Sequence, residues 1–381
     1  MKIKLMEDSI GEEEIRAVNE CLNSKEYTHG RVVEDFEKRF AEWNGSKYAV
    51  MVNSGSSANL LMISLLKQRC GFLNDDEIIV PSVTWPTTVY PILQNGMNPV
   101  FCDVDESFNL DVNSLKRMIS EKTKAVFLVH LLGQSAKIEE IKEICDKNRL
   151  ILIEDCCESL GARFNGIKVG NFGKMASFSF YFGHHITTIE GGMVVTDDFE
   201  FYELLKSMRS HGWTRGTTRH SKYPDKNKNF TFDVFGYNFR NTNLNASIGI
   251  VQLNKLDSFI RKRIENHNYF LEKIKDLDLE SQKVNLNETS SFSFAVILKS
   301  KEERDFVLEN LPLKGVECRP VVGGNLLKQP VFKNKFYKQD KTTMADIIDN
   351  KGIYLPNNQY MNNDKIDYMI KSIKEILSER I

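Results

Sequence analysis

The chain has 381 residues, of which 41% are hydrophobic and 27% charged, a composition typical of a globular protein with one large or two medium domains. Its 51 basic and 52 acidic residues leave a formal net charge of −1, which argues against binding to nucleic acid or to anionic membranes. There is no visible secretory signal, no apolar run that could span a bilayer, and no CxxC pair among seven cysteines, so we expect a cytoplasmic protein with reduced thiols.

Short apolar runs alternate with helical patterns from residue 48 to about residue 200. The runs that predict buried strands are Tyr48–Val52, Glu77–Val80, Pro99–Val104, Lys124–Leu131 and Leu150–Ile153. Residues 138–147 have the spacing of an amphipathic helix between the last two runs. This alternation predicts an α/β fold with a mainly parallel central sheet, in which ligands bind beyond the carboxyl ends of the strands.

The second half of the chain has a different pattern. Residues 216–232 are polar, basic and irregular, as in an exposed loop. A charged helix is expected from Lys255 to about Lys275, and the segments after it predict a smaller α+β unit. We therefore expect a large domain with an N-terminal arm at residues 1–255 and a small C-terminal domain at residues 256–381.

Residues that suit a phosphate and an aromatic ring follow three of the predicted strands. Gly55 and Ser56 lie where a strand meets a helix, so their backbone N–H groups can bind an anion or simply belong to a capped helix end. Asp155 ends another strand, and its carboxylate can pair with a protonated pyridine nitrogen or cap a helix. Trp85 follows a third strand, where an indole can stack on such a ring or pack in the core.

His184 and His185 form a pair that could suggest a metal site. Neighbouring side chains on an extended segment point to opposite faces, and no cluster of acidic residues or cysteines accompanies them. We therefore expect no metal. Lys174 lies ten residues before His184 and is expected at the far end of the intervening strand.

Three spaced motifs together resemble those of the DegT/DnrJ/EryC1/StrS family of pyridoxal-phosphate (PLP) sugar aminotransferases. Residues 177–192 are similar to S-F-x-x-x-K-x-I-T-x-G-E-G-G, residues 151–161 to E-D-x-A-Q-x-x-G, and residues 236–246 to G-Y-N-x-R-M-x-x-x-x-A. The resemblance is good over residues 8–255 and weak beyond. It implies the PLP-dependent aspartate aminotransferase fold (fold type I), with PLP bound by the large domain.

The resemblance also assigns roles to the strand-end residues. Gly55, Ser56 and Ser179 are expected to hold the PLP phosphate. Trp85 is expected to stack on the cofactor ring, and Asp155 to pair with its nitrogen.

Further roles depend on single matches to the family pattern. Glu158 stands where the family has a glutamine near the phenolic oxygen of PLP. Asn238 matches an asparagine that reaches the phosphate in the neighbouring subunit, which implies a homodimer with shared active sites. His211 and Arg319 are candidates for substrate contact, with a capped helix end and a surface charge as their structural alternatives.

His184 falls where the family has the lysine that bonds to PLP. An imidazole moves protons but forms no stable imine, so this substitution argues for elimination rather than amino transfer to a sugar. Two branches of the family lack the lysine, and one of them uses an iron–sulfur cluster with a reductase partner. The ligands of that cluster follow the histidine, whereas this chain has no cysteine between Cys157 and Cys318. We therefore expect neither the cluster nor the reductase.

The resemblance thus predicts a PLP/PMP-dependent, lyase-type enzyme, where PMP is pyridoxamine phosphate. It takes L-glutamate as amino donor and removes the C3 hydroxyl of a nucleotide-linked 4-keto-6-deoxy sugar, with GDP-4-keto-6-deoxy-D-mannose as the expected substrate, for dideoxysugar and O-antigen biosynthesis. His184 is the expected general base at the C4′ carbon of the cofactor, a task that an ordinary pKa near ~6.5 suits. A nucleotide-sugar 4-aminotransferase and a non-catalytic PLP-fold binding protein remain as alternatives.

Overall fold

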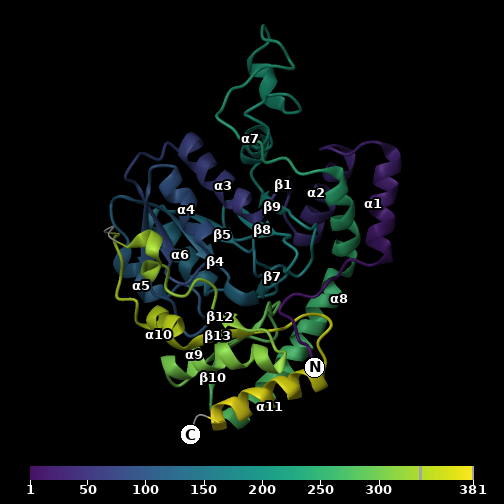
Figure 1. Ribbon diagram of the computed structural model, residues 1–381. Helices are drawn as coiled ribbons and strands as arrows, with labels where there is room; N and C mark the ends of the chain where they lie inside the picture. The colour runs from purple at the N-terminus through teal and green to yellow at the C-terminus, as the bar shows by residue number, and fades with distance from the viewer. Residues whose placement is uncertain (334–336, 380–381) are drawn as a thin grey trace.

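A seven-stranded sheet forms the centre of the larger part of the molecule (Figure 1). The computed structural model describes residues 1–333 and 337–379. The strand order is β1-β9-β8-β5-β4-β2-β3, and among the described strands of this sheet β9 alone runs in the direction opposite to the other six. The strands are β1 (Tyr48–Val52), β2 (Glu77–Pro81), β3 (Asn98–Cys102), β4 (Thr123–Val129), β5 (Ile151–Asp155), β8 (Ala176–Ser179) and β9 (Gly192–Thr196).

Helices pack on both faces of this sheet. Alternate residues of β1 enter different cores: Val50 and Val52 pack with α3, α4 and α7, whereas Ala49 and Met51 pack with α2 and α8. Every residue of β2 is buried, as parallel strands covered on both faces require. The helices of this part are α1 (Glu12–Ser24), α2 (Arg31–Asn44), α3 (Gly55–Arg69), α4 (Pro86–Gln94), α5 (Val112–Met118), α6 (Ile138–Asn148), α7 (Phe199–Arg209) and α8 (Asn243–Ile274).

A smaller antiparallel sheet lies below the first in Figure 1. Its order is β10-β11-β13-β12, and its core is separate and contains residues of α8, α9 and α11. The elements are β10 (Glu280–Ser281), β11 (Phe294–Ile297), β12 (Arg319–Pro320), β13 (Gly352–Leu355), α9 (Lys301–Asn310), α10 (Thr343–Lys351) and α11 (Asn363–Glu379). A short hairpin, β6 (Arg163–Phe164) with β7 (Ile167–Lys168), belongs to neither sheet.

Helix α8 connects the two parts. It begins at Asn243 and not at Lys255 as predicted, because the side chain of Thr242 accepts a hydrogen bond from the Asn245 N–H and caps a polar first turn. The helix passes through residue 255, so the division into domains at 1–255 and 256–381 stays a prediction.

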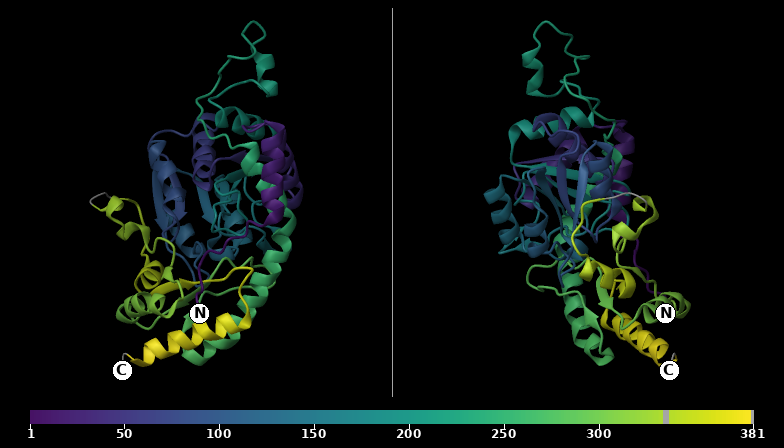
Figure 2. Two further views of the ribbon diagram at one scale, coloured as in Figure 1. Left: turned by 45° about the vertical axis from the view of Figure 1, so that its right-hand side comes forward. Right: turned by 90° about the vertical axis from the view of Figure 1, so that its left-hand side faces the viewer.

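The basic segment predicted as a loop projects far from the rest of the molecule (Figure 2). It follows α7, contains only the short 3-10 helix Thr218–Lys222, and is closed at its base by a bridge between Trp213 and Phe232. Two of its phenylalanines are exposed, Phe230 to 68% and Phe232 to 53%. Across the described part of the chain, no helix is both long and apolar enough for a membrane crossing.

Candidate active site

A cavity of about 560 Å³ lies at the carboxyl ends of β1, β5 and β8, beside the small sheet. Strand ends meet there because these three strands run parallel. Eight of the ten predicted site residues line it: Gly55, Ser56, Trp85, Asp155, Glu158, Ser179, His184 and Arg319. Residues more than 250 positions apart in the sequence are thus brought to one site.

The first turn of α3 forms an anion-binding end of this cavity. The side chain of Ser54 caps the helix by accepting the Ser57 N–H at 3.0 Å. The first N–H groups of a helix, here those of Gly55 and Ser56, have no partner within the helix. A Cβ at Gly55 would lie 2.7 Å from Ser179 Cβ, so only glycine lets the Ser179 hydroxyl approach this turn. Free N–H groups, a hydroxyl and the helix dipole fit a phosphate.

The carboxylate of Asp155 is held by three donors. Its Oδ2 accepts hydrogen bonds from Asn59 Nδ2 at 2.8 Å and from Thr88 Oγ1 at 2.9 Å, and its Oδ1 accepts the Cys157 N–H at 3.1 Å. Ser177 Oγ donates to Asn59 Oδ1 at 2.5 Å and thereby orients the amide. Donors fix both carboxylate oxygens in place, an arrangement that suits pairing with a cationic ring nitrogen. The chain turns after Asp155 without forming a helix, so Asp155 is not a helix cap.

Glu158 is half-buried at the cavity wall, where its Oε2 accepts the Leu132 N–H at 3.0 Å. Burial raises the pKa of Glu158 to about 7, the charge of Asp155 adds to this rise, and the Leu132 N–H opposes it. Much of Glu158 is therefore protonated near neutral pH. A protonated carboxyl can donate a hydrogen bond, as the amide of a glutamine does.

His184 is held through one ring nitrogen. Its Nδ1 lies 2.6 Å from the carbonyl oxygen of Cys157. A carbonyl only accepts, so Nδ1 carries the hydrogen and Nε2 keeps a lone pair. Burial lowers the pKa of His184 to about 4, against the opposing effects of the Cys157 carbonyl and of Asp155. The expectation of an ordinary pKa near ~6.5 is therefore wrong, and the neutral ring dominates at neutral pH.

No lysine is among the described residues that line the cavity. Lys174 lies just before β8, at the end of that strand away from Ser179. Its Nζ is 2.6 Å from Asp198 Oδ2, an ion pair outside the cavity. Neither residue contributes to the cavity wall.

His185 points away from the cavity that His184 lines. It is fully buried, and its Nε2 lies 3.1 Å from the carbonyl oxygen of Ser290. The two neighbouring imidazoles therefore do not converge on a common ligand.

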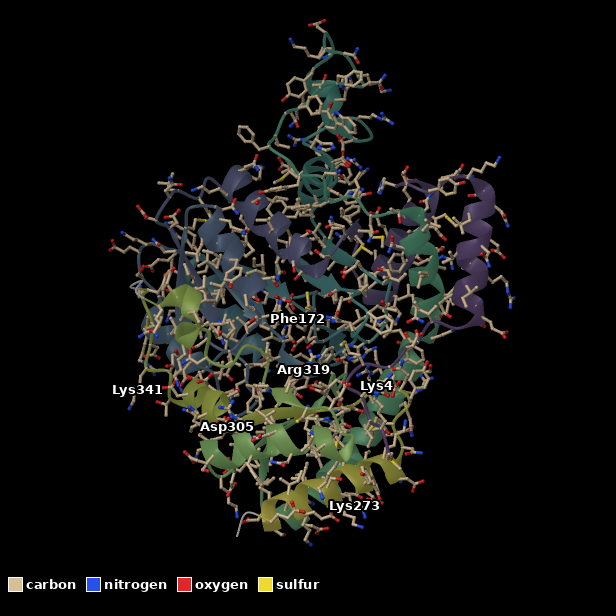
Figure 3. The ribbon with its side chains drawn as sticks, in the orientation of Figure 1. Lys4, Phe172, Lys273, Asp305, Arg319 and Lys341 are labelled. Carbon is tan, nitrogen blue, oxygen red and sulfur yellow. The ribbon has the colours of Figure 1, made fainter. Side chains whose placement is uncertain are left out.

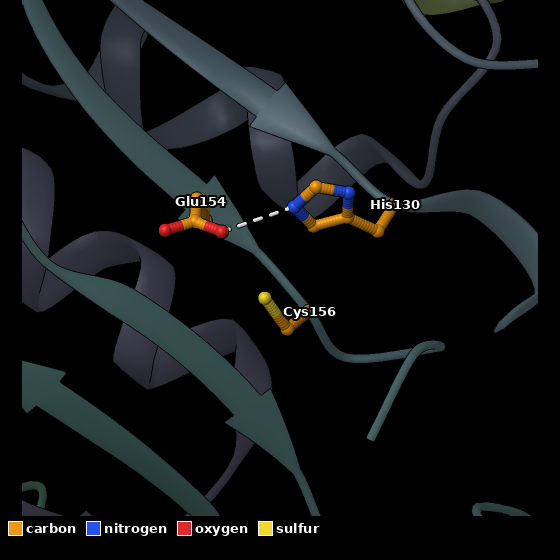
Figure 4. Close-up of side chains that lie close together, drawn as sticks. All are labelled: His130, Glu154 and Cys156. Atoms are coloured by element: carbon orange, nitrogen blue, oxygen red, sulfur yellow. Dashed lines mark hydrogen bonds and ion pairs between the residues drawn. The ribbon is translucent and has the colours of Figure 1, made fainter. Parts of the chain in front are cut away.

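Another group, His130, Glu154 and Cys156, has its side-chain atoms close enough to hold a metal (Figure 4). His130 Nδ1 accepts the Ala136 N–H at 3.1 Å, so His130 Nε2 carries the hydrogen that it donates to Glu154 Oε2 at 3.1 Å. Glu154 also accepts the N–H groups of Gly170, Phe172 and Gly173. Burial raises the pKa of the Cys156 thiol well above its usual value. With its ligand atoms hydrogen-bonded or protonated, this group ties β5 to the following loop.

Trp85 and Arg319 reach the cavity from different parts of the fold. Trp85 is 56% exposed at the start of α4, so its indole does not pack in the core. Arg319 comes from β12 of the small sheet, where it pairs with Tyr354 of β13. Both side chains are accessible to a molecule in the cavity.

Many further residues line the cavity without having been predicted, and several of them are apolar or aromatic. Leu5, Met6, Phe292 and Tyr354 come from the N-terminal segment and from the small sheet and its approach. No motif, charge or spacing marks them, because each is an ordinary apolar or aromatic residue far from the motifs in sequence. Only their position in space connects them with the site.

His211 and Asn238 lie outside the cavity, at the base of the projecting loop. His211 follows α7 with a left-handed backbone (φ 64°), and its ring is 5.4 Å from that of Trp213. Asn238 is exposed and forms a bridge with Ser210. Their expected roles in substrate and phosphate binding stay predictions.

A second cavity of about 820 Å³ opens beside this base. It is larger than the first, but it contains none of the ten predicted residues. Basic side chains, among them Arg209, Arg215 and Arg240, line it together with Glu34 and Glu37. We take the smaller cavity as the candidate active site, because the donor set for a phosphate, the held carboxylate and His184 all meet there.

Comparison with known proteins extends this description. A profile of the DegT/DnrJ/EryC1/StrS aminotransferase family matches residues 8–374. The chain belongs to this family. Within the family it is 42% identical over 377 residues to GDP-4-keto-6-deoxy-D-mannose 3-dehydratase of Escherichia coli O55:H7, covering 95% of this chain and 96% of the relative. It is 33% identical over 386 residues to GDP-perosamine synthase of Escherichia coli O157:H7, covering 99% of each.

Solved structures of the DegT/DnrJ/EryC1/StrS family superpose closely on this one. A histidine-to-asparagine mutant of GDP-4-keto-6-deoxymannose-3-dehydratase with bound GDP-perosamine has a TM-score of 0.92 at 40% identity, covering 98% of this chain and all of that one. The same enzyme with a trapped PLP-glutamate geminal diamine has a TM-score of 0.89 at 40% identity, with the same coverage. These likenesses confirm the predicted family and the predicted aminotransferase fold.

Proposed function

We propose that this chain is a PLP/PMP- and glutamate-dependent, lyase-type enzyme. It removes the C3 hydroxyl of a nucleotide-linked 4-keto-6-deoxy sugar, with GDP-4-keto-6-deoxy-D-mannose as substrate. One observation carries the proposal: His184, with a free Nε2 lone pair, stands in the cavity where the family has its lysine. The similarity to enzymes that bear the name of this reaction supports the choice of substrate.

The residues of the cavity fit PLP. The first turn of α3 together with Ser179 suits its phosphate, Asp155 its ring nitrogen, Trp85 a ring face and Glu158 its phenolic oxygen. When bound, PLP and its amino form PMP supply an electron sink and carry the amino group of glutamate. The 3,6-dideoxy-4-keto product is a suitable precursor for the dideoxysugars of an O-antigen.

His184 moves the protons of the elimination. Its neutral Nε2 removes a proton from C4′, and the resulting imidazolium protonates the C3 hydroxyl as it leaves. The Cys157 carbonyl fixes the ring through Nδ1 during both steps. The overall reaction needs no reductase, because glutamate supplies the two electrons that reduce the sugar. Glutamate is converted to 2-oxoglutarate and ammonia, which together contain the oxygen atom that the sugar loses.

We also propose a homodimer with shared active sites. The projecting loop exposes Phe230 and Phe232, and Asn238 is exposed at its base. Apolar side chains on a protruding segment suit contact with a second copy of the chain. In that arrangement Asn238 reaches the phosphate held by α3 of the partner.

The test is mass spectrometry of the PLP-loaded enzyme with L-glutamate and GDP-4-keto-6-deoxy-D-mannose. We expect a sugar that lacks one oxygen, formed together with 2-oxoglutarate and only when glutamate is present. An amino sugar would instead establish a 4-aminotransferase. Unchanged sugar, with no spectral change of bound PLP on addition of glutamate, would indicate a binding protein.

A further inference from the structure

The N-terminal segment contributes two residues to the cavity wall. Leu5 and Met6 both line the candidate active site, whereas Lys4 lines an adjoining groove and not the cavity itself. Figure 3 places Lys4 and Arg319 between the large sheet and the small sheet, and both border that groove. The N-terminal segment therefore lies next to Arg319 at the wall of the cavity.

Hydrogen bonds fix this segment to residues 315–317, which lead into β12 of the small sheet. The Ile3 N–H donates to the Gly315 carbonyl at 2.8 Å, the Glu317 N–H donates to the Ile3 carbonyl at 2.9 Å, and the Leu5 N–H donates to Glu317 Oε2 at 2.9 Å. The side chain of Ile3 is 1% exposed in the small core. Because the Leu5 N–H is bonded to Glu317, it is not available as a donor to a molecule in the cavity.

Met6 packs against the turn that carries His184. A Cβ at Gly183 would collide with Met6 Sδ and lie 2.7 Å from Met6 Cγ. Glycine at 183 is what allows this close approach. Met6 is thus held next to His184, while Leu5 is held by Glu317, two residues before Arg319.

We propose that Leu5 and Met6 determine specificity for a 6-deoxy sugar. The inference rests on the proposed function and names the feature of the substrate that this wall selects. The C5 methyl is the only apolar substituent on the sugar of such a substrate. A leucine and a thioether offer no strong hydrogen-bond partner, so a 6-hydroxyl at this wall would lose its bonds to water without replacement.

The experiment compares two stable probes, GDP-6-deoxy-D-mannose and GDP-D-mannose, which differ by the hydroxyl on C6. Calorimetry with the PLP-loaded enzyme is expected to show about tenfold tighter binding of the 6-deoxy sugar. Leu5→Asn and Met6→Gln keep the side-chain length and add an amide that can bind a hydroxyl. In these variants the preference is expected to fall to about threefold or less. Lys4→Gln, on the same segment but outside the cavity, is the control and keeps the tenfold ratio.

Binding of GDP alone separates the remaining outcomes. If Leu5→Asn and Met6→Gln weaken GDP and both sugars equally, the wall contacts the nucleotide and the inference is wrong. Equal binding of the two sugars by the unaltered enzyme, with GDP still bound, also overturns it and leaves the proposed function standing. If neither GDP nor either sugar binds, the proposed function fails, and the inference with it. Melting temperatures establish which variants fold, and either variant alone suffices for the test.

Discussion

His184 and Glu158 share one cavity, and burial changes their proton affinities in opposite directions. It lowers the pKa of His184 to about 4 and raises that of Glu158 to about 7. The neutral form of each is favoured, because a low-dielectric environment penalises charge. The cavity therefore holds an unprotonated base together with a carboxyl that is partly protonated at neutral pH. Groups with such separated proton affinities are suited to different tasks in one reaction.

Replacement of His184 tests the proton transfer. His184→Asn keeps an N–H donor for the Cys157 carbonyl but has no base, so kcat for dehydration is expected to fall by about 10²- to 10⁴-fold. Affinity for PLP, measured by fluorescence titration, is expected to stay nearly unchanged. His184→Lys is expected to lose dehydration and to gain amino transfer to the sugar, which mass spectrometry of the product detects. Full dehydratase activity in either variant would remove His184 from the mechanism.

Replacement of Glu158 tests its proton affinity. Its pKa is about 7 in the folded protein and ordinarily near 4.5, so the folded state binds this proton more tightly. The stability that the proton contributes is complete below pH 4.5 and is lost as the pH rises to about 7. Glu158→Gln cannot lose a proton, so its melting temperature is expected to exceed that of the unaltered apoprotein at pH 8 and to match it at pH 4. Glu143→Gln, on the exposed side of α6, is the control. A pH-independent difference would contradict the assignment.

At the scale of elements, α8 joins the two sheets and supports the wall of the site. Arg263 on this helix is 3% exposed and donates to the carbonyls of Phe292, at 2.9 Å, and Asn357. Within the described residues no carboxylate pairs with it. The Phe292 ring lies 5.3 Å from that of His184, so the position of α8 is transmitted to the base.

Loss of the Arg263 side chain is expected to affect stability and chemistry together. Arg263→Met leaves buried carbonyls without donors and is expected to cost about 2–4 kcal/mol in the free energy of unfolding, measured with urea. The charge of Arg263 lowers the pKa of His184, so its removal is expected to shift the acidic limb of the kcat profile to higher pH. Lys262→Met is the matched control, because Lys262 is half-exposed and forms only a surface pair with Glu265 at 3.6 Å. An unchanged pH profile would limit Arg263 to a structural role.

At the scale of the whole molecule, the projecting loop extends from one end of an otherwise compact body (Figure 2). His211 and Asn238 lie at its base and away from the cavity. The proposed homodimer with shared sites accounts for both positions, since in it residues at the loop base serve the partner.

Mixing two inactive variants tests the shared site. Asn238→Ala and His184→Asn are each expected to be inactive alone. In randomly reassorted dimers half are mixed, and each mixed dimer has one site with both native residues, so about a quarter of full activity is expected to return. Activity is measured after the variants are mixed under conditions that exchange subunits, with each variant taken through the same exchange by itself as a control. No recovery, with exchange demonstrated by differently tagged chains, would place Asn238 outside the partner's site.

Much of the fold could be predicted from the sequence, because short apolar runs between polar turns carry a local signal. Tyr48–Val52 is β1 as expected, and Glu77–Val80 is β2 but for one residue. Helix α8 was predicted to start too late, since its first turn is rich in asparagine. That turn is stabilised by the Thr242 cap and by Asn243, which bonds to residues of the N-terminal region.

The sequence by itself determined which chemical groups are available: a phosphate-binding turn, an acidic strand end, and an imidazole at the position of a lysine. These are local patterns of residue type and spacing, and they require no knowledge of neighbours in space. Only the tertiary structure decided the pKa of His184 and of Glu158, the donors around Asp155, and the presence of Leu5, Met6 and Phe292 at the cavity. Burial, hydrogen bonding and cavity shape depend on segments that lie hundreds of residues apart and meet only when the chain is folded.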